Sequence, residues 1–306
     1  MAVDGFETVT IVSAGGAATA EFVPGANMVC HSLTHRGAEL LHAGRGVAAY
    51  AEQGKTMGIP LLHPWANRLA RPGYEVAGTQ VVLPSPEGRY GLDPNGLPIH
   101  GALPGRLRWQ VDEIPDGDRV GARLEWSDPD LLELFPFVHE LRLDAWVGDA
   151  GLELVTTLRA TGEDTVPVSF GYHPYLRPPG QLPRSEWQVS LGASERLVLD
   201  DRMIPTGATE PLAHTSFRLD DQSWDDGLSG LLAPPAFAVT AGPATLTLTF
   251  DEGFDYAQVY APVGQDFICF EPMTAPTNAL VSGDGLTLVA PGGEHRAAFS
   301  VTVTDN

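Results

Sequence analysis

The sequence predicts an antiparallel all-β protein, a large β-sandwich with very little helix. Segments in which apolar and polar residues alternate dominate the 306 residues, and this period of two is typical of strands with one buried face. Glycine (34 residues) and proline (26) are spread along the whole chain and supply turns between short strands. Amphipathic segments of helical period are scarce, and only Asp130–Leu134 is predicted as one short helical turn.

Alternation is clearest in His139–Val147, where an apolar residue occupies every second position after the histidine. Gly148–Gly151 then turns the chain into Leu152–Leu158, so the two segments predict an antiparallel hairpin. The other predicted strands are, in chain order, Phe6–Ala14, Ala18–Val23, Met28–Thr34, Gln80–Leu83, Leu107–Ile114, Val120–Trp126, Trp187–Leu191, Ala244–Phe250, Tyr256–Tyr260, Phe267–Glu271, Leu286–Val289 and His295–Thr304.

Composition indicates how many domains the chain forms. Hydrophobic residues make up 43% of the chain, which is enough for a sizeable core. There is no internal repeat of fixed period, and the composition does not change across the loops at 178–183 (PPGQLP) and 230–235 (GLLAPP). We therefore expect a single domain over residues 1–306.

The formal net charge of -21 argues against a nucleic-acid or anionic-membrane partner, although it leaves room for a small ligand. Cys30 and Cys269 lie in apolar segments and are predicted to be buried, reduced thiols. The amino terminus has no basic region followed by an apolar core, and no apolar run approaches transmembrane length. We expect a cytoplasmic protein, with a monomer and a homodimer both open.

Two reactive side chains follow strand-like segments and precede prolines. The apolar run Phe267–Phe270 leads to Glu271, and Pro272 predicts that the strand ends there. A carboxylate in such a place loses hydration, so it needs a partner or a function. In the same way Val166–Tyr172 leads to His173. One carboxylate and one imidazole in matching positions indicate proton transfer.

Five segments, two of which contain His173 and Glu271, have loop residues around arginine, histidine, carboxylate and aromatic side chains, which together suit the recognition of a sugar. They are 63–68 (HPWANR), 98–101 (PIHG), 170–175 (FGYHPY), 270–274 (FEPMT) and 224–228 (WDDGL). A single histidine in a loop is more often at the surface or structural than catalytic, and we interpret His31, His35, His42, His139, His214 and His295 as structural or exposed. No complete zinc-binding motif is present, no GxGxxG motif follows a predicted strand, and no hydrolase elbow occurs, so neither metal nor cofactor is expected.

Six motifs, in their order along the chain, resemble the aldose 1-epimerase (galactose mutarotase) family, and HPWxNR is similar to its bacterial epimerase-like branch. The motifs are HPWANRLARPGY (63–74), PIHG (98–101), FGYHPYL (170–176), IPTG (204–207), DDGLSGL (225–231) and ICFEPMTAPTNAL (268–280). The resemblance implies the galactose mutarotase-like supersandwich, a large antiparallel β-sandwich. It also implies an isomerase of carbohydrate metabolism that interconverts the α and β anomers of a free aldose without a cofactor.

The resemblance also implies roles for individual residues. Glu271 matches the family's catalytic base, and His173 matches its catalytic acid. Burial should raise the pKa of Glu271, while the nearby carboxylate should favour the charged form of His173. Arg68, His100 and Asp225 match residues that bind the substrate in the family. Asp226 is the alternative to Asp225, and Asn67 is a supporting contact. Leu228 replaces an aromatic residue of many relatives, which suggests that the aspartate segment packs differently.

Three alternatives stay open. A hexose-6-phosphate 1-epimerase would use the same acid and base and would need further cations for the phosphate. The arginines in or near loops are Arg71, Arg89, Arg177 and Arg184. A glycosidase would need two carboxylates, for which Glu271 and Asp225 could serve. A non-catalytic sugar-binding protein would need no matched acid and base.

Overall fold

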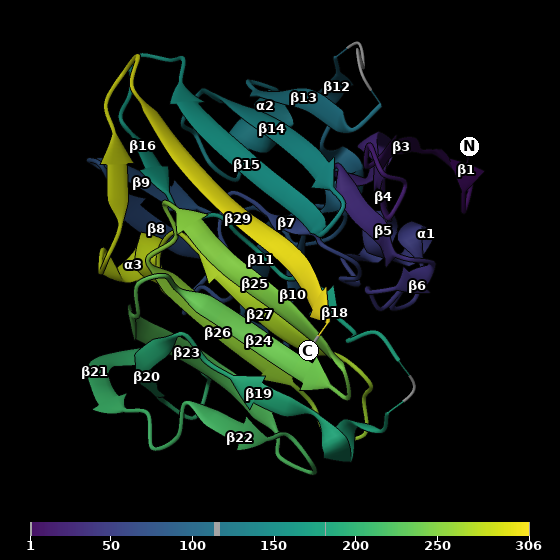
Figure 1. Ribbon diagram of the computed structural model, residues 1–306. Helices are drawn as coiled ribbons and strands as arrows, with labels where there is room; N and C mark the ends of the chain where they lie inside the picture. Colours follow the sequence, from purple (N-terminus) through teal and green to yellow (C-terminus); the bar gives the residue numbers. More distant parts are fainter. Residues whose placement is uncertain (1, 113–116, 181, 306) are drawn as a thin grey trace.

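The structure is a computed structural model, and it describes residues 2–112, 117–180 and 182–305. Two large antiparallel sheets form its body, as the alternation in the sequence predicts (Figure 1). The nine-stranded sheet has the order β12 (Gln110–Val111), β13 (Arg119–Trp126), β14 (His139–Gly148), β15 (Gly151–Ala160), β29 (Glu294–Asp305), β25 (Ala244–Glu252), β24 (Ala236–Ala241), β19 (Gln188–Ser190) and β22 (Ser216–Arg218).

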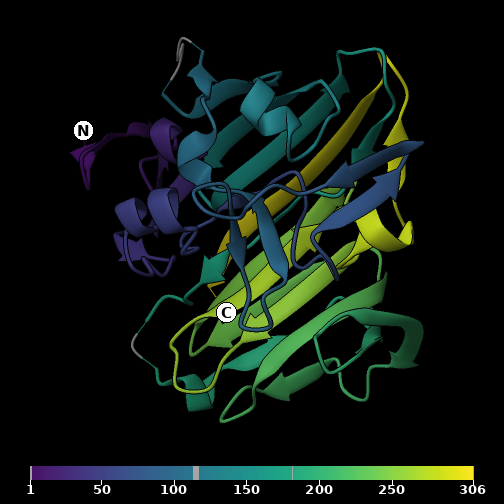
Figure 2. The ribbon, with the colours of Figure 1, turned by 180° about the vertical axis from the view of Figure 1, so that it is seen from behind.

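The second sheet has eight strands. Its order is β21 (Pro205–Pro211), β20 (Ala193–Leu199), β23 (Trp224–Leu231), β26 (Tyr256–Ala261), β27 (Ile268–Met273), β17 (Gly171–Tyr172) and β7 (Leu61–Leu62), with β18 (Tyr175–Leu176) also paired to β27. Glu271 lies in its strand β27, and His173 lies between its strands β17 and β18. From behind, the blue strands β10 and β11 lie in front of the green strands of this sheet (Figure 2).

Smaller elements complete the fold. A four-stranded sheet has the order β3 (Val9–Val12), β4 (Ala18–Val23), β5 (Val29–His35) and β6 (Ala38–Glu39). The two-stranded pairs are β1 (Ala2–Val3) with β2 (Phe6–Glu7), β8 (Gly73–Val76) with β9 (Thr79–Val82), β10 (Tyr90–Leu92) with β11 (Pro98–Ala102), and β16 (Val166–Val168) with β28 (Thr287–Val289). The helices are short: α1 (Val47–Gln53), α2 (Pro129–Leu132), α3 (Ala279–Ser282) and the 3-10 turns Pro24–Ala26, Pro104–Arg106 and Arg184–Glu186.

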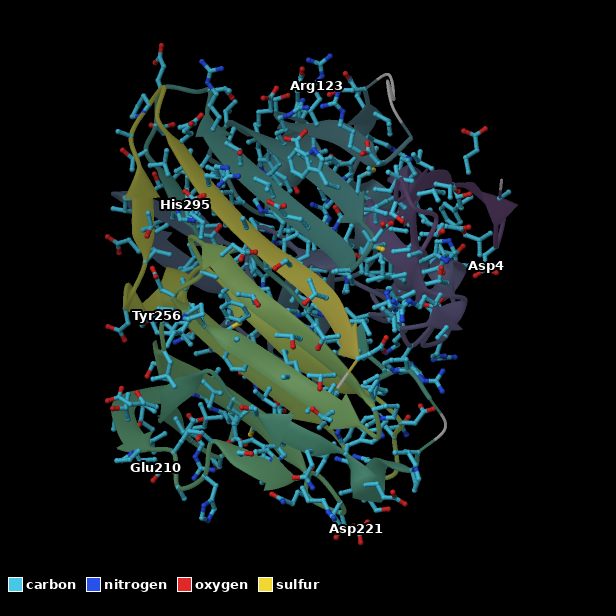
Figure 3. The ribbon with its side chains drawn as sticks, viewed as in Figure 1. Asp4, Arg123, Glu210, Asp221, Tyr256 and His295 are labelled. Atoms are coloured by element: carbon cyan, nitrogen blue, oxygen red, sulfur yellow. The ribbon has the colours of Figure 1, made fainter. Side chains whose placement is uncertain are left out.

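The core lies between the two large sheets. Alternate residues of β14 (Leu141, Leu143, Ala145 and Val147) are buried, because every second side chain of a strand points to the same face. The ring centroids of Phe237 in β24 and Phe270 in β27 are 5.8 Å apart, so the two sheets pack directly against each other. Acidic side chains such as Asp4 and Asp221 lie exposed at the edges of the molecule (Figure 3).

Several predicted elements have different limits. The predicted strand Phe6–Ala14 is divided into β2 and β3, and only β12 forms within Leu107–Ile114, whose residues 113 and 114 lie outside the described part. The hairpin is confirmed, with Gly148 paired to Gly151. The short turn predicted at Asp130–Leu134 is confirmed as α2, which begins one residue earlier and ends two residues earlier than predicted.

The prediction that Pro272 ends its strand is wrong. β27 continues to Met273, and Ala257 of β26 pairs with Pro272. The φ of proline, about −65°, lies within the extended region, so proline removes one backbone donor without breaking the strand direction. Glu271 is therefore held on both sides by regular strand rather than at a free end.

Candidate active site

His173 and Glu271, which lie far apart in the sequence, are neighbours in space. His173 Nε2 lies 3.2 Å from Glu271 Oε1. Two strand pairings bring them together: Gly171 before the histidine pairs with Met273, and Tyr175 after it pairs with Cys269. The chain between these pairings must pass beside Glu271. Both side chains are almost wholly buried, as the sequence predicts for a carboxylate at the end of an apolar run.

Burial changes the protonation of this pair. It raises the pKa of Glu271 well above the ordinary value; Asp225 adds to the rise and Arg68 opposes it. Burial also lowers the pKa of His173 to about 3. The prediction that the carboxylate favours charged His173 is therefore wrong, because the loss of hydration outweighs the attraction. Both shifts favour the uncharged forms, which are protonated Glu271 and neutral His173.

His100 lies beside the pair, held by an unusual backbone. Its ring centroid is 5.6 Å from that of His173. Its φ is +63°, and that of Asn67 is +57°, a region that non-glycine residues rarely occupy. The His100 N–H donates to the Asn67 carbonyl at 3.0 Å, so the two strained residues support each other. Such outliers are often found at functional sites. Burial lowers the pKa of His100 well below its ordinary value, with smaller effects from His173 and Arg68.

The Arg68 guanidinium is fixed by three neighbours. Its Nε donates to Asp93 Oδ2 at 2.9 Å, and one terminal nitrogen donates to Asn67 Oδ1 at 3.0 Å. The other terminal nitrogen lies 3.5 Å from Asp225 Oδ2. Asp93 is itself anchored, because its Oδ1 accepts from the N–H groups of Asn95 and Leu97. The arginine is thus presented in one orientation.

Asp225 and Asp226 have separate surroundings. Gln258 Nε2 donates to Asp225 Oδ1 at 2.6 Å, which ties Asp225 to the strand next to Glu271. Asp226 instead lies 3.3 Å from Arg196. The prediction that this segment is a loop is wrong, because it belongs to strand β23, in which successive side chains point to opposite faces. Leu228 is fully buried in the core.

One cavity of about 370 Å³ connects these groups. All six residues predicted for the site line it, and its volume is in the range of small-ligand pockets. The predicted residues are Asn67, Arg68, His100, His173, Asp225 and Glu271; the other lining residues are Thr56, Pro94, Ile99, Tyr175 and Tyr260. Tyr175 stacks on His173, with ring centroids 4.5 Å apart, and Tyr260 meets the same ring edge-on at 5.8 Å.

Sequence reasoning missed three supporting residues. Asp93 lies in a segment with glycine, proline and asparagine, which is typical of an ordinary turn. Tyr260 was included only as a strand residue. Gln258 could have been predicted from the sequence, because an amide side chain within the apolar strand β26 is expected to be buried and therefore to need a hydrogen-bond partner.

Within the described ranges, no group of three or more histidine, cysteine, aspartate or glutamate side chains could hold a metal ion. Both cysteines are buried and free, as predicted. Among the described residues, no helix is long and apolar enough to cross a membrane.

Solved structures show the same fold. The Slr1438 protein of Synechocystis sp. PCC 6803 matches with a TM-score of 0.80 at 22% identity, over 100% of this chain and 98% of that one. A putative aldose 1-epimerase of Escherichia coli K12 matches with a TM-score of 0.79 at 16% identity, over 99% and 100% of the two chains. The architecture is therefore the galactose mutarotase-like β-sandwich.

Sequence comparison identifies the family. The model for aldose 1-epimerase matches residues 12–302, so the chain belongs to the aldose 1-epimerase family. Galactose mutarotase of Rattus norvegicus is 30% identical over 158 residues, which is 50% of this chain and only 42% of the rat protein. The uncharacterized protein YihR of Escherichia coli K12 is 24% identical over 297 residues, 86% of this chain and 89% of that protein. Membership in this family supports an epimerase activity in general terms.

Proposed function

We propose that the protein is a mutarotase that interconverts the α and β anomers of a free aldose. The observation that carries the proposal is the contact between His173 and Glu271 in the cavity that Arg68, His100 and Asp225 also line. An acid and a base that share one proton are what ring opening needs. Polarimetry of freshly dissolved α-D-glucose and α-D-galactose tests the proposal.

In the proposed reaction Glu271 is the base and His173 is the acid. In the active form of the pair the proton lies on His173, whose Nε2 is 3.2 Å from Glu271 Oε1. Glu271 then accepts the proton of the C1 hydroxyl, a C1=O double bond forms, and the C1–O5 bond breaks. His173 donates its proton to O5. Each such transfer is worth roughly a hundredfold to ten-thousandfold in rate.

Reclosure reverses these transfers. After rotation about C1–C2, the O5 hydroxyl returns its proton to His173 and attacks the other face of C1, while the carbonyl oxygen takes the proton from Glu271. The two protons and the bonding electrons balance without a redox step. His100 lies close enough to His173 to interact with the ring oxygen as its charge changes.

The remaining polar residues would bind hydroxyl groups. Arg68, Asn67 and Asp225 form a connected set of donors and acceptors along the cavity. Tyr175 and Tyr260 supply aromatic surface for the apolar face of a pyranose ring. In this scheme the hydroxyl contacts orient the sugar so that C1 and O5 meet Glu271 and His173.

A hexose-6-phosphate substrate is the second candidate, because a further cavity of about 510 Å³ shares Thr56, Arg68 and His100 with the site. Arg45 and Lys55, the only lysine of the sequence, line it. None of the four arginines named in the sequence analysis lines either cavity. Competition between sugar phosphates and free sugars separates the two substrates: Lys55→Ala should weaken only a phosphorylated one.

A sugar-binding protein without catalysis would not need the buried acid and base. Burying two ionisable groups is costly unless they are paired or used. Sugar affinity without any acceleration of mutarotation would support that alternative.

A further inference from the structure

His63 and His139 form a buried histidine pair outside the cavity, next to the segment that contains Asn67 and Arg68. His63 Nε2 and His139 Nε2 are 2.9 Å apart, and both side chains are almost fully buried. His139 begins strand β14 of the nine-stranded sheet, whereas His63 begins the segment that leads to Asn67 and Arg68. The contact therefore joins one large sheet to the segment that supplies the substrate-binding groups.

The hydrogen bonds assign the proton positions of this pair. His139 Nδ1 lies 2.6 Å from the Phe137 carbonyl, which can only accept, so Nδ1 carries the proton. In the neutral ring Nε2 of His139 is then an acceptor, and His63 Nε2–H is the donor to it. His63 Nδ1 is left without a proton and has no hydrogen-bond partner among the described residues. Both imidazoles are neutral in this arrangement.

Aromatic packing holds the pair in place. His139 stacks on Trp126 with ring centroids 5.4 Å apart, and His63 meets Trp126 edge-on at 4.9 Å. Trp126 is fully buried and donates from its indole nitrogen to the Phe135 carbonyl at 2.9 Å. The imidazoles therefore have little freedom to move.

The backbone of His63 contacts the segment that carries His100. The His63 carbonyl accepts from Ala102 N–H at 2.9 Å, and His63 forms a bridge with Gly101. Gly101 has φ of +71°, and a Cβ there would lie 2.1 Å from the His63 carbonyl oxygen, so the two backbones are in close contact. Arg68 forms a further bridge with Ile99. The segments 63–68 and 98–102 are thus joined by several backbone contacts and form one structural unit.

We propose that His63 and His139 are positioning residues: their hydrogen bond fixes the unit that carries Asn67, Arg68 and His100 against the nine-stranded sheet. Neither side chain lines the cavity, so neither touches the substrate. Neutral imidazole suits this role, because its two nitrogens make one donor and one acceptor. The effect of this histidine pair on catalysis rests on the proposed mutarotase activity. Its structural role, which is to hold the segments 63–68 and 98–102 in place, does not.

The first test measures the protons directly. Long-range 1H–15N correlation spectra of the whole protein at pH 7 should show His139 as the Nδ1–H tautomer and His63 as the Nε2–H tautomer. A cationic ring at either position, or a proton on His63 Nδ1, would overturn the assignment.

The second test compares His139→Leu with His139→Gln, since only glutamine can accept from His63 Nε2–H. In His139→Leu, amide hydrogen exchange at His100 and Ala102 should accelerate at least about tenfold, whereas His139→Gln should stay near wild type. Unchanged exchange in His139→Leu, or equal effects of both variants, would refute the proposal. If His139→Leu does not fold, His63→Asn against His63→Leu gives the same comparison from the donor side.

The third test measures whether loss of the His63–His139 hydrogen bond weakens substrate binding. In His139→Leu the KM for D-galactose and D-glucose should rise at least about tenfold with a smaller change in kcat, because a misplaced Arg68 binds sugar less well. If the wild-type protein does not accelerate mutarotation, the proposed function is refuted. The hydrogen-exchange experiment still tests the positioning role in that case. Altered exchange with unchanged KM would refute the link to the substrate.

Discussion

His173 Nε2 lies 3.2 Å from Glu271 Oε1, and both groups are driven by burial toward their uncharged forms. This relationship determines the pH dependence of the proposed reaction. The pair works while it holds one proton. It gains a second proton only near the lowered pKa of His173, and it loses the first only above the raised pKa of Glu271.

We therefore predict that kcat/KM does not fall as the pH decreases from about 7 to about 5, although histidine ordinarily titrates near 6.5. The acid limb should appear only toward the pKa of His173, which is about 3. Initial rates by polarimetry, corrected for the uncatalysed rate at each pH, give the profile. An acid limb with a midpoint near 6.5 would contradict the assignment.

Asp225 and Asp226 provide a matched pair of variants on adjacent residues. Asp225→Asn should raise the KM for sugar about tenfold or more, because Asp225 lines the cavity and contacts Arg68 and Gln258. Asp226→Asn should leave KM near wild type, since its partner is Arg196. Equal effects, or a larger effect at Asp226, would show that the cavity is not where the sugar binds.

Arg68→Ala should weaken sugar binding more than it slows the chemical step. The guanidinium lies in the cavity without contacting the proton-transfer pair, so its loss should appear mainly in KM. Asp93→Asn, which removes the charge that orients Arg68, should shift KM in the same direction by a smaller factor. A changed kcat with unchanged KM in Arg68→Ala would contradict this role.

Stability should fall as the pH decreases below about 6.5. Burial lowers the folded-state pKa values of His63, His100, His139 and His173 below their unfolded values. Their contribution is complete above the unfolded pKa and is lost as the pH falls toward the folded pKa, at about 1.4 kcal/mol per pH unit for each histidine. Glu271 acts in the opposite sense, because its folded-state pKa is raised and the stability that it contributes grows as the pH falls toward 4.5.

Urea unfolding at several pH values measures this slope. His139→Phe should reduce it by about 1.4 kcal/mol per pH unit between pH 6.5 and the folded pKa of about 4. His214→Phe at an exposed position is the control and should keep the wild-type slope. An unchanged slope in His139→Phe would mean that this imidazole is not buried in its neutral form.

The sequence predicted the parts of the fold that depend on local pattern. The alternation in β14 and the glycine turn into β15 follow from a period of two and a local backbone requirement. Strands β20 and β21 were missed, because most of their side chains are partly or fully exposed and leave no apolar pattern. Pro272 was given too much weight as a strand breaker, because pairing with β26 outweighs one lost donor.

Residue type and motif predicted the candidate residues that line the cavity, while the electrostatics of the cavity required coordinates. All six predicted residues line one cavity, but the role of Asp93 in holding Arg68 depends on a contact between distant segments. The direction of the His173 pKa shift could not be predicted, because burial and attraction by a carboxylate oppose each other. Only the burial of the imidazole decides which effect is larger.

In the proposed reaction Glu271 and His173 both exchange protons with one sugar. Polarimetry with Glu271→Gln and His173→Ala is the decisive test of these two roles, and Glu153→Gln on the exposed face of β15 is the control. We predict that each active-site variant loses at least about a hundredfold in mutarotation rate while its circular dichroism spectrum stays unchanged, and that the control keeps the wild-type rate. A folded Glu271→Gln or His173→Ala protein with a rate near wild type would contradict the account.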